Sequence, residues 1–249
     1  MKQLCILHHL GMGDHLHCNG MVRHLLEQNS NEIEKLLLFC WKRNYKNVEY
    51  MYRDEDKITI VPLIDDHNEI QQVGYFMNHP LVTDKPEYEM YRIGYDKFRE
   101  IKSQYPDLTC DQCFYKQLDI PYEYRFSKFY YERDSEEEER VFKKLVPEGK
   151  EYVFVHDNPH RDYIIDLNKI DSKYEIVKND ETESIFHFAK ILENASEIHC
   201  IESSFRCFIE GLNTSQAKHY FHPVNTEFSR FDKNNLGTGT SKEWTFVEY

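Results

Sequence analysis

Residues 4–14 read LCILHHLGMGD. Leu4 to Leu10 make a short apolar run typical of a buried strand, and the Gly-Met-Gly-Asp that follows is typical of a tight turn. From His15 to Leu26 the apolar residues recur at helical spacing, which predicts a helix directly after the turn. A strand, a glycine turn and a helix in this order begin a unit of α/β structure.

The same alternation continues along the chain. Apolar runs predict further strands at 36–40, 58–64, 152–156, 174–177, 198–201 and 219–221, the last strand that we expect. Helical spacing between the runs predicts parallel sheets with covering helices, and one further helix around 91–103. Because Pro147-Glu148-Gly149 interrupts the pattern, we predict two Rossmann-like α/β domains. The first spans residues 1–148 with an irregular, tyrosine-rich middle region, and the second spans residues 149–249.

Composition limits the class of protein. The 249 residues carry 31 Lys and Arg against 44 Asp and Glu, a net charge of −13, which argues against a nucleic-acid partner. An odd number of cysteines, seven, at irregular spacing favours a reducing compartment over a disulfide framework. The sequence predicts no transmembrane segment and no signal peptide, so we expect a cytoplasmic protein.

The first candidate site is the glycine turn itself. Two of the nine glycines, Gly11 and Gly13, lie in this turn, where free backbone N–H groups allow close approach of an anionic or sugar ligand. Asp14 is either a helix N-cap or a group that contacts a ligand. His15 and Asn19 follow on the predicted helix. The turn lacks the third glycine of the G-x-G-x-x-G dinucleotide fingerprint.

Two further candidates follow strands in the second half of the chain. His156 and Arg161 flank a loop after a strand, and an arginine guanidinium suits a diphosphate, although Arg161 could also be a surface residue of a turn. Glu202-Ser203-Ser204-Phe205 opens a helix after another strand. The serines either cap this helix or, with its free N–H groups, bind a phosphate, and Glu202 is placed to bind a ribose hydroxyl.

A metal site is the weaker interpretation of the histidines. His8, His9, His15 and His17 could join Cys110 and Cys113 as zinc ligands, but a single C-x-x-C without a second pair is not enough. His8 and His9 also point to opposite faces of a strand, so they cannot both face one site. We therefore predict no metal.

Together these segments resemble a compact glycosyltransferase of the GT-B type, which implies that the two predicted domains face a central cleft. Residues 7–14, followed by Val22-Arg23-His24-Leu25, resemble the opening of the ADP-heptose:lipopolysaccharide heptosyltransferase family, whose Leu-Gly-Asp-type turn presents an aspartate to the acceptor. Residues 198–205 are similar to that family's strand ending in Asp-Thr-Gly, with Glu202 in the acidic position, and to the Ser-Ser-Phe turn of fucosyltransferases. His156 and Arg161 resemble the fucosyltransferase His-x-Arg-Arg strand end, here with four residues between them.

The resemblance implies a reaction. A nucleotide-sugar donor would pass its sugar to a glycan or other hydroxyl acceptor, with Asp14 as general base and inversion by a single displacement. The departing diphosphate would be held without a metal ion, and no cofactor besides the donor substrate is implied. The donor-side residues would be His156, Arg161, Glu202, Ser203, Ser204 and Phe205, and the acceptor-side residues Gly11, Gly13, His15 and Asn19.

Three alternatives stay open at this point. A GT-A glycosyltransferase would need a metal-binding Asp-x-Asp after a strand, but Asp54-Glu55-Asp56 precedes a predicted strand and Asp65-Asp66 lacks the spacing. A non-catalytic nucleotide- or glycan-binding module would use exposed tyrosines and tryptophans. A nucleotide-processing hydrolase on a Rossmann-like fold would consume nucleotide alone.

Overall fold

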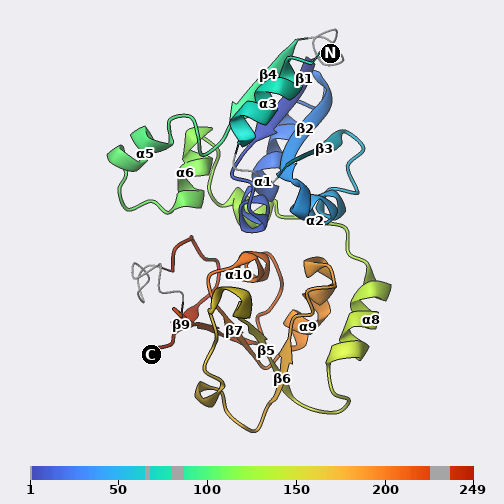
Figure 1. Cartoon of the computed structure of the whole chain (residues 1–249), viewed down its shortest axis with the longest axis vertical. Coiled ribbons are helices and arrows are strands. Elements are labelled where there is room, and N and C mark those ends of the chain that lie inside the picture. Colours follow the sequence, from blue (N-terminus) through green and yellow to red (C-terminus); the bar gives the residue numbers. More distant parts are fainter. Residues whose placement is uncertain (1, 65–67, 80–86, 225–235) are drawn as a thin grey trace. The chain divides into compact units, whose positions relative to one another are not determined.

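The computed structural model describes residues 2–64, 68–79, 87–224 and 236–249, and the chain divides into two compact units, Met1–Glu132 and Arg133–Tyr249. Each unit is an α/β structure built on one parallel sheet (Figure 1). This confirms the predicted α/β class with parallel sheets.

The first sheet has the strand order β3-β2-β1-β4, with all neighbours parallel. Its strands are β1 (Lys2–Leu7), β2 (Ile33–Trp41), β3 (Ile58–Leu63) and β4 (Tyr88–Arg92). The three predicted strands are present. The predicted helix around 91–103 is wrong in its first half, because Tyr91 and Arg92 belong to the edge strand β4, where side chains are only half-buried.

Helix α1 (Met12–Gln28) is the central helix of this unit, and most of its residues are buried. After β2 come η1 (Lys42–Asn44) and α2 (Tyr45–Met51), and α3 (Glu69–Met77) follows β3. The tyrosine-rich middle region forms α5 (Phe98–Gln104), α6 (Cys110–Gln117) and α7 (Tyr124–Ser127). A buried ion pair between Asp111 and Arg125, with Tyr122 hydrogen-bonded to the same carboxylate at 2.5 Å, joins α6 to α7.

The second sheet has the order β6-β5-β7-β8-β9, again parallel throughout. Its strands are β5 (Tyr152–His156), β6 (Glu175–Lys178), β7 (Glu197–Cys200), β8 (Lys218–Phe221) and β9 (Trp244–Phe246). The helical elements are α8 (Ser135–Leu145), η2 (Pro159–Arg161), η3 (Leu167–Lys169), η4 (Ile185–Phe188), α9 (Ala189–Asn194) and α10 (Ser204–Ile209). The expectation that 219–221 is the last strand is wrong, because β9 adds an edge strand of three residues.

The division between the units falls before α8, not at the predicted residue 148. The reason is packing: the ring of Phe142 lies 6.2 Å from that of Tyr152 on β5. Lys144 also pairs with Asp180 at 2.8 Å, and Arg140 pairs with Glu183. These contacts make α8 part of the second sheet's covering layer, and Pro147-Glu148-Gly149 is a turn inside the second unit.

Candidate functional site

Each sheet reverses its strand order at one place. In the first unit the chain runs outward from β1 through β2 and β3 and then returns to the other side of β1 with β4. In the second unit it runs from β5 to β6 and returns to the other side with β7. Ligands of open α/β sheets bind outside the carboxyl ends of the strands at such a reversal. The glycine turn follows β1, and the two later candidate segments follow β5 and β7, so all three lie at these reversals.

In the glycine turn, the residue at the N-cap of α1 is Gly11, with extended backbone angles, and the helix begins at Met12. Asp14 is therefore the third helical residue, and the alternative that it is the N-cap is wrong. A Cβ atom on Gly11 would lie 2.7 Å from Oδ2 of Asp14. Glycine at this position thus makes room for the Asp14 carboxylate over the start of the helix, where the N-terminal dipole favours a negative charge.

The other two acceptor-side residues point into the protein. His15 is fully buried with its ring 4.4 Å from that of His8, and burial holds the His15 pKa well below its usual value. Asn19 is also buried, and its carboxamide donates to the carbonyl of Tyr130 at 3.0 Å and accepts from the Tyr130 N–H at 2.9 Å. Asn19 therefore ties α1 to the segment after α7, a role that its sequence position does not reveal.

His156 ends β5. Its Nδ1 lies 2.8 Å from Oδ1 of Asn179, and its ring centre lies 4.5 Å from that of Phe205. Burial lowers the His156 pKa below its usual value, which favours the neutral ring. Asn179 was missed by the sequence analysis, although it directly follows β6 at the same edge of the sheet.

Ser203 is the N-cap residue of α10, but its hydroxyl does not cap the helix. The Ser203 hydroxyl is buried and has no hydrogen-bond partner among the residues that the structure describes. A buried hydroxyl without a partner costs free energy, which is a common sign of a ligand or water position. Capping alone therefore does not explain Ser203.

Glu202 is engaged within the protein. Its carboxylate accepts a hydrogen bond of 2.5 Å from Nε of Arg206, one helical turn later. Arg206 is fully buried and also donates to the backbone carbonyl of Leu236 at 3.1 Å. Glu202 thus neutralises a buried guanidinium, and this ion pair by itself explains an acidic residue at position 202.

Arg161 lies at the end of η2 and is exposed. Within the described ranges, no hydrogen bond or ion pair joins its side chain to another residue. By contrast Asp157, in the same loop, is buried and pairs with Lys178 at 2.8 Å. Asp157 and Lys178 fix the start of the loop, and the Arg161 guanidinium stays available to a ligand or to solvent.

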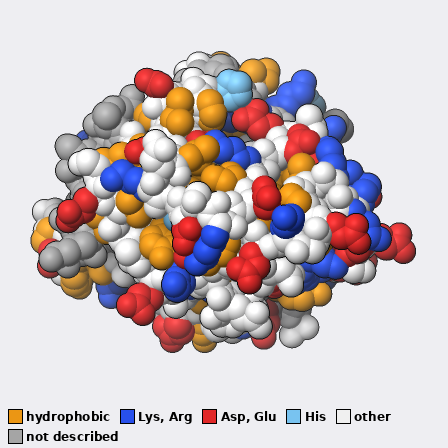
Figure 2. All heavy atoms as spheres, turned by 90° about the horizontal axis from the view of Figure 1, so that it is seen from below, with side chains coloured by type: hydrophobic (Ala, Val, Ile, Leu, Met, Phe, Trp, Pro, Cys, Tyr) orange, Lys and Arg blue, Asp and Glu red, His pale blue; other side chains and the backbone are white. Residues whose placement is uncertain are grey.

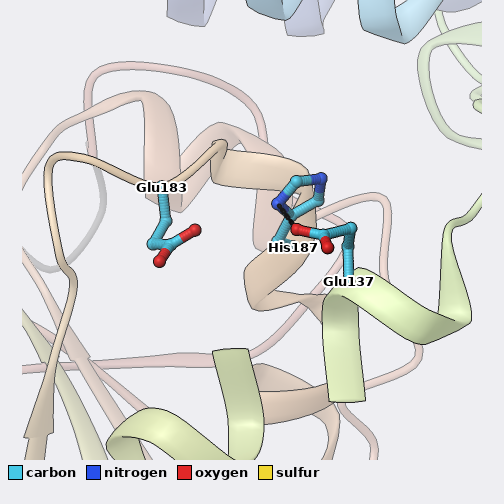
Figure 3. Close-up of side chains that lie close together, drawn as sticks. All are labelled: Glu137, Glu183 and His187. Atoms are coloured by element: carbon cyan, nitrogen blue, oxygen red, sulfur yellow. Dashed lines mark ion pairs between the residues drawn. The ribbon is translucent and has the colours of Figure 1, made fainter. Parts of the chain in front are cut away.

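Among the described residues, one group has the arrangement of a metal site: Glu137, Glu183 and His187. Their ligand atoms all lie within 4.8 Å of one another, and in Figure 3 the Glu137 carboxylate faces the His187 ring, with 3.8 Å between Oε2 of Glu137 and Nδ1 of His187. Both glutamates already pair with Arg140, and Glu183 also pairs with Lys144 at 2.7 Å. The group is an ion-pair network that holds α8 on the second unit.

Two carboxylate motifs, Asp54-Glu55-Asp56 and Asp65-Asp66, were the candidates for a GT-A metal site. Asp54 receives two hydrogen bonds from Arg23, at 2.8 and 2.9 Å, so it serves a structural ion pair in the first unit. Asp65-Asp66 lies outside the described residues.

On the face shown in Figure 2, acidic and basic side chains are interspersed, which is not the single-sign field of a polyanion-binding surface. Within the described part of the chain, no helix combines the length and apolar character needed to cross a membrane.

The fold and these two sheet reversals define a class: an α/β protein with candidate ligand sites at the carboxyl edges of two parallel sheets. No protein-family model and no curated protein sequence matches the chain. Among solved structures, a glycosyl transferase family 9 protein from Veillonella parvula is similar over 99% of this chain and 86% of its own, with a TM-score of 0.58 and 7% identity.

Two structures of the heptosyltransferase WaaC from E. coli are also similar. One contains ADP and aligns with a TM-score of 0.49 at 13% identity, covering 99% of this chain and 92% of that one. The other contains ADP-2-deoxy-2-fluoro heptose and aligns with a TM-score of 0.46 at 11% identity, covering 99% and 93%. At these identities the likeness of the Veillonella protein shows a shared fold.

Proposed function

We propose that the protein is a glycosyltransferase of the GT-B type that moves a sugar from a nucleotide-sugar donor to a hydroxyl acceptor. The observation that carries the proposal is the coincidence of the polar candidate residues with the two sheet reversals. The shared fold with a glycosyl transferase family 9 protein over 99% of the chain supports the same reaction class.

On the acceptor side, Asp14 is the proposed general base. Its carboxylate lies in the first turn of α1 and is half-exposed, so an acceptor hydroxyl can reach it. Removing the proton from this hydroxyl makes it a nucleophile that displaces the nucleotide from the sugar carbon in one step, with inversion. Gly11 and Gly13, which carry no side chains, lie next to Asp14 in this turn.

On the donor side, the proposed diphosphate ligands are the Ser203 hydroxyl, the backbone N–H groups at Ser204 and Phe205, and the Arg161 guanidinium. These donors stabilise the negative charge that develops on the departing nucleotide, so the reaction needs no metal ion. His156 adds a second cation when the diphosphate raises its pKa and the ring takes up a proton. Glu202, held by Arg206, is the proposed ribose ligand.

A thermal-shift screen tests the donor site. GDP, UDP, ADP, CMP and their sugar conjugates are compared, and a ligand present at 100 times its dissociation constant stabilises the fold by about 2.7 kcal/mol. We expect one nucleotide class to raise the melting temperature of the wild type, and to do so much less in Arg161→Ala. Absence of a shift with every nucleotide would contradict the donor site. A shift without any release of nucleotide from the matching nucleotide sugar would indicate the non-catalytic binding module.

A further inference from the structure

The second unit has a cavity of about 490 Å³ at the edge opposite to the candidate donor site. The residues before β8 and β9 and the first residues of these strands line it: Asn213, Thr214, Ser215, Ala217, Lys218, His219, Ser241, Lys242, Glu243 and Thr245. Because the strands are parallel, their amino ends lie at one edge and the candidate donor residues at the other. The four residues of β8 separate the two edges by about 13 Å.

The lining of this cavity differs in charge from the chain as a whole. Acids exceed Lys and Arg by 13 in the sequence, yet two lysines line the cavity against one acid, Glu243, with the buried Glu210 behind Ser241. Most of the remaining lining residues carry hydroxyl or amide groups, but the Ser215 hydroxyl already donates to Oδ1 of Asn213 and the Ser241 hydroxyl to Glu210. The lysine ammonium groups are therefore the donors of this lining that bind phosphate oxygens.

Buried side chains next to the cavity hold its lining segments in place. Thr214 and His219 are buried, and the Thr214 hydroxyl lies 2.8 Å from Nε2 of His219. Glu210, which is also buried, accepts from the Ser241 N–H at 2.6 Å and from the Trp244 indole N–H at 2.7 Å. The two segments that form the cavity are therefore held in place before any ligand arrives.

Lys242 is the cation that this framework positions best. Its ammonium group donates to the carbonyl of Leu212 at 2.7 Å, which leaves two of its three N–H donors for a ligand. Burial lowers the Lys242 pKa, and burial together with the nearby Lys242 lowers the His219 pKa to about 4. Burial leaves the Lys242 ammonium group poorly solvated, so an anion placed at its two remaining N–H donors would pair with it.

We propose that this cavity binds the phosphoryl group of a small phosphorylated molecule, with Lys218 and Lys242 as its cationic ligands. The volume exceeds the needs of a bare phosphate, so part of the molecule that bears the phosphate fits as well. Glu243 disfavours ligands of high negative charge and favours a single phosphoryl group over a polyanion. This site is separate from the proposed donor site and needs none of its residues.

Calorimetric titration with glucose 6-phosphate, inorganic phosphate and glucose tests the proposal. We expect the two phosphates to bind and glucose not to bind. Lys242→Ala should weaken binding roughly tenfold, equivalent to about 1.4 kcal/mol, with Lys242→Arg restoring much of it. Lys218→Ala should weaken it by roughly threefold, and Glu243→Gln should strengthen it by a similar factor, because it removes a like charge.

Two controls locate the binding. Lys173→Ala removes an exposed lysine of the same unit that pairs with Asp171 and should change nothing. Ser203→Ala, at the opposite edge of the sheet, should also leave phosphate binding intact. The proposal is overturned if the wild type binds no phosphate, if glucose binds equally well, or if binding depends on Ser203 and survives Lys218→Ala. Because Lys218 is exposed at the start of β8, that variant stays folded even if Lys242→Ala does not.

Discussion

Ser203 leaves a local structural question that a ligand would answer, and Asp14 is the carboxylate proposed to act on the acceptor. Asp14 folds over Gly11 at the start of α1, although the helix does not use it as the N-cap. Ser203 occupies an N-cap position, yet its buried hydroxyl makes no capping bond. Structural roles account for Asn19 and Glu202, whose partners are Tyr130 and Arg206. Asp14 and Ser203 are therefore the residues at which the proposed function is tested first.

Ser203→Ala separates binding from stability. The hydroxyl has no partner among the described residues, so its removal should leave the free energy of unfolding unchanged or slightly higher. A lost hydrogen bond to a charged phosphate should weaken donor binding by about 1.5–3 kcal/mol, or roughly ten- to a hundredfold. The free energy of unfolding and the donor affinity are both measured for Ser203→Ala. Ser127→Ala is the control for a serine whose hydroxyl does have a partner, because the Ser127 hydroxyl donates to the carbonyl of Glu123. Unchanged donor affinity would remove Ser203 from the site.

The elements show which parts of the fold could be predicted from the sequence. Strands such as β2 and β7 are mostly buried, so apolar runs reveal them. The edge strands β4 and β9 are half-exposed and rich in polar and aromatic residues, and no apolar run marks them. The placement of the three candidate segments directly after β1, β5 and β7 was predictable, because each follows an apolar run. Asn179 and the partners of Asn19 depend on contacts between distant segments, which local pattern does not contain.

Gly20 and Gly74 form a matched pair for testing helix packing. A Cβ on Gly20 of α1 would lie 2.0 Å from the backbone carbonyl oxygen of Tyr124, so Gly20→Ala forces α1 and α7 apart. We expect a loss of about 1–3 kcal/mol or more in the free energy of unfolding. Gly74 of α3 has nothing within 4 Å of such an atom, and Gly74→Ala should gain up to about 1 kcal/mol from helix propensity. Equal effects of the two variants would contradict this packing of α1 against α7.

Six histidines are buried in the described part of the chain: His8, His15, His17, His199, His219 and His222. Burial lowers the pKa of His8 and of His219 to about 4 and that of His222 to about 3. His222 is buried, with its Nε2 2.9 Å from Nδ1 of His199 and its Nδ1 2.7 Å from the hydroxyl of the exposed Tyr249. The folded protein takes up protons at the His8, His219 and His222 rings only at about pH 4 and below.

As the pH is lowered, the free energy of unfolding should therefore begin to decrease at a pH well above that at which carboxylates titrate. In the unfolded chain these histidines have a pKa near 6.5, so below that pH the unfolded state binds more protons and the folded state loses stability. Between pH 6.5 and 5 the loss is about 2 kcal/mol for each such histidine. Urea unfolding at pH 7.5, 6.5, 5.5 and 5 measures it, and His219→Gln should reduce the slope. A flat profile over this range would show that the histidines are not buried in the neutral form.

Turnover by Asp14→Asn tests the proposed reaction most directly. The rate of nucleotide release from the sugar nucleotide selected by thermal shift is measured in this variant, in the wild type and in Glu100→Gln, which alters another acid in a first helical turn of the same unit. If Asp14 is the general base, its variant keeps the fold and the donor affinity but loses roughly 10²- to 10⁴-fold in rate, while Glu100→Gln stays normal. A near-normal rate in Asp14→Asn would contradict the account.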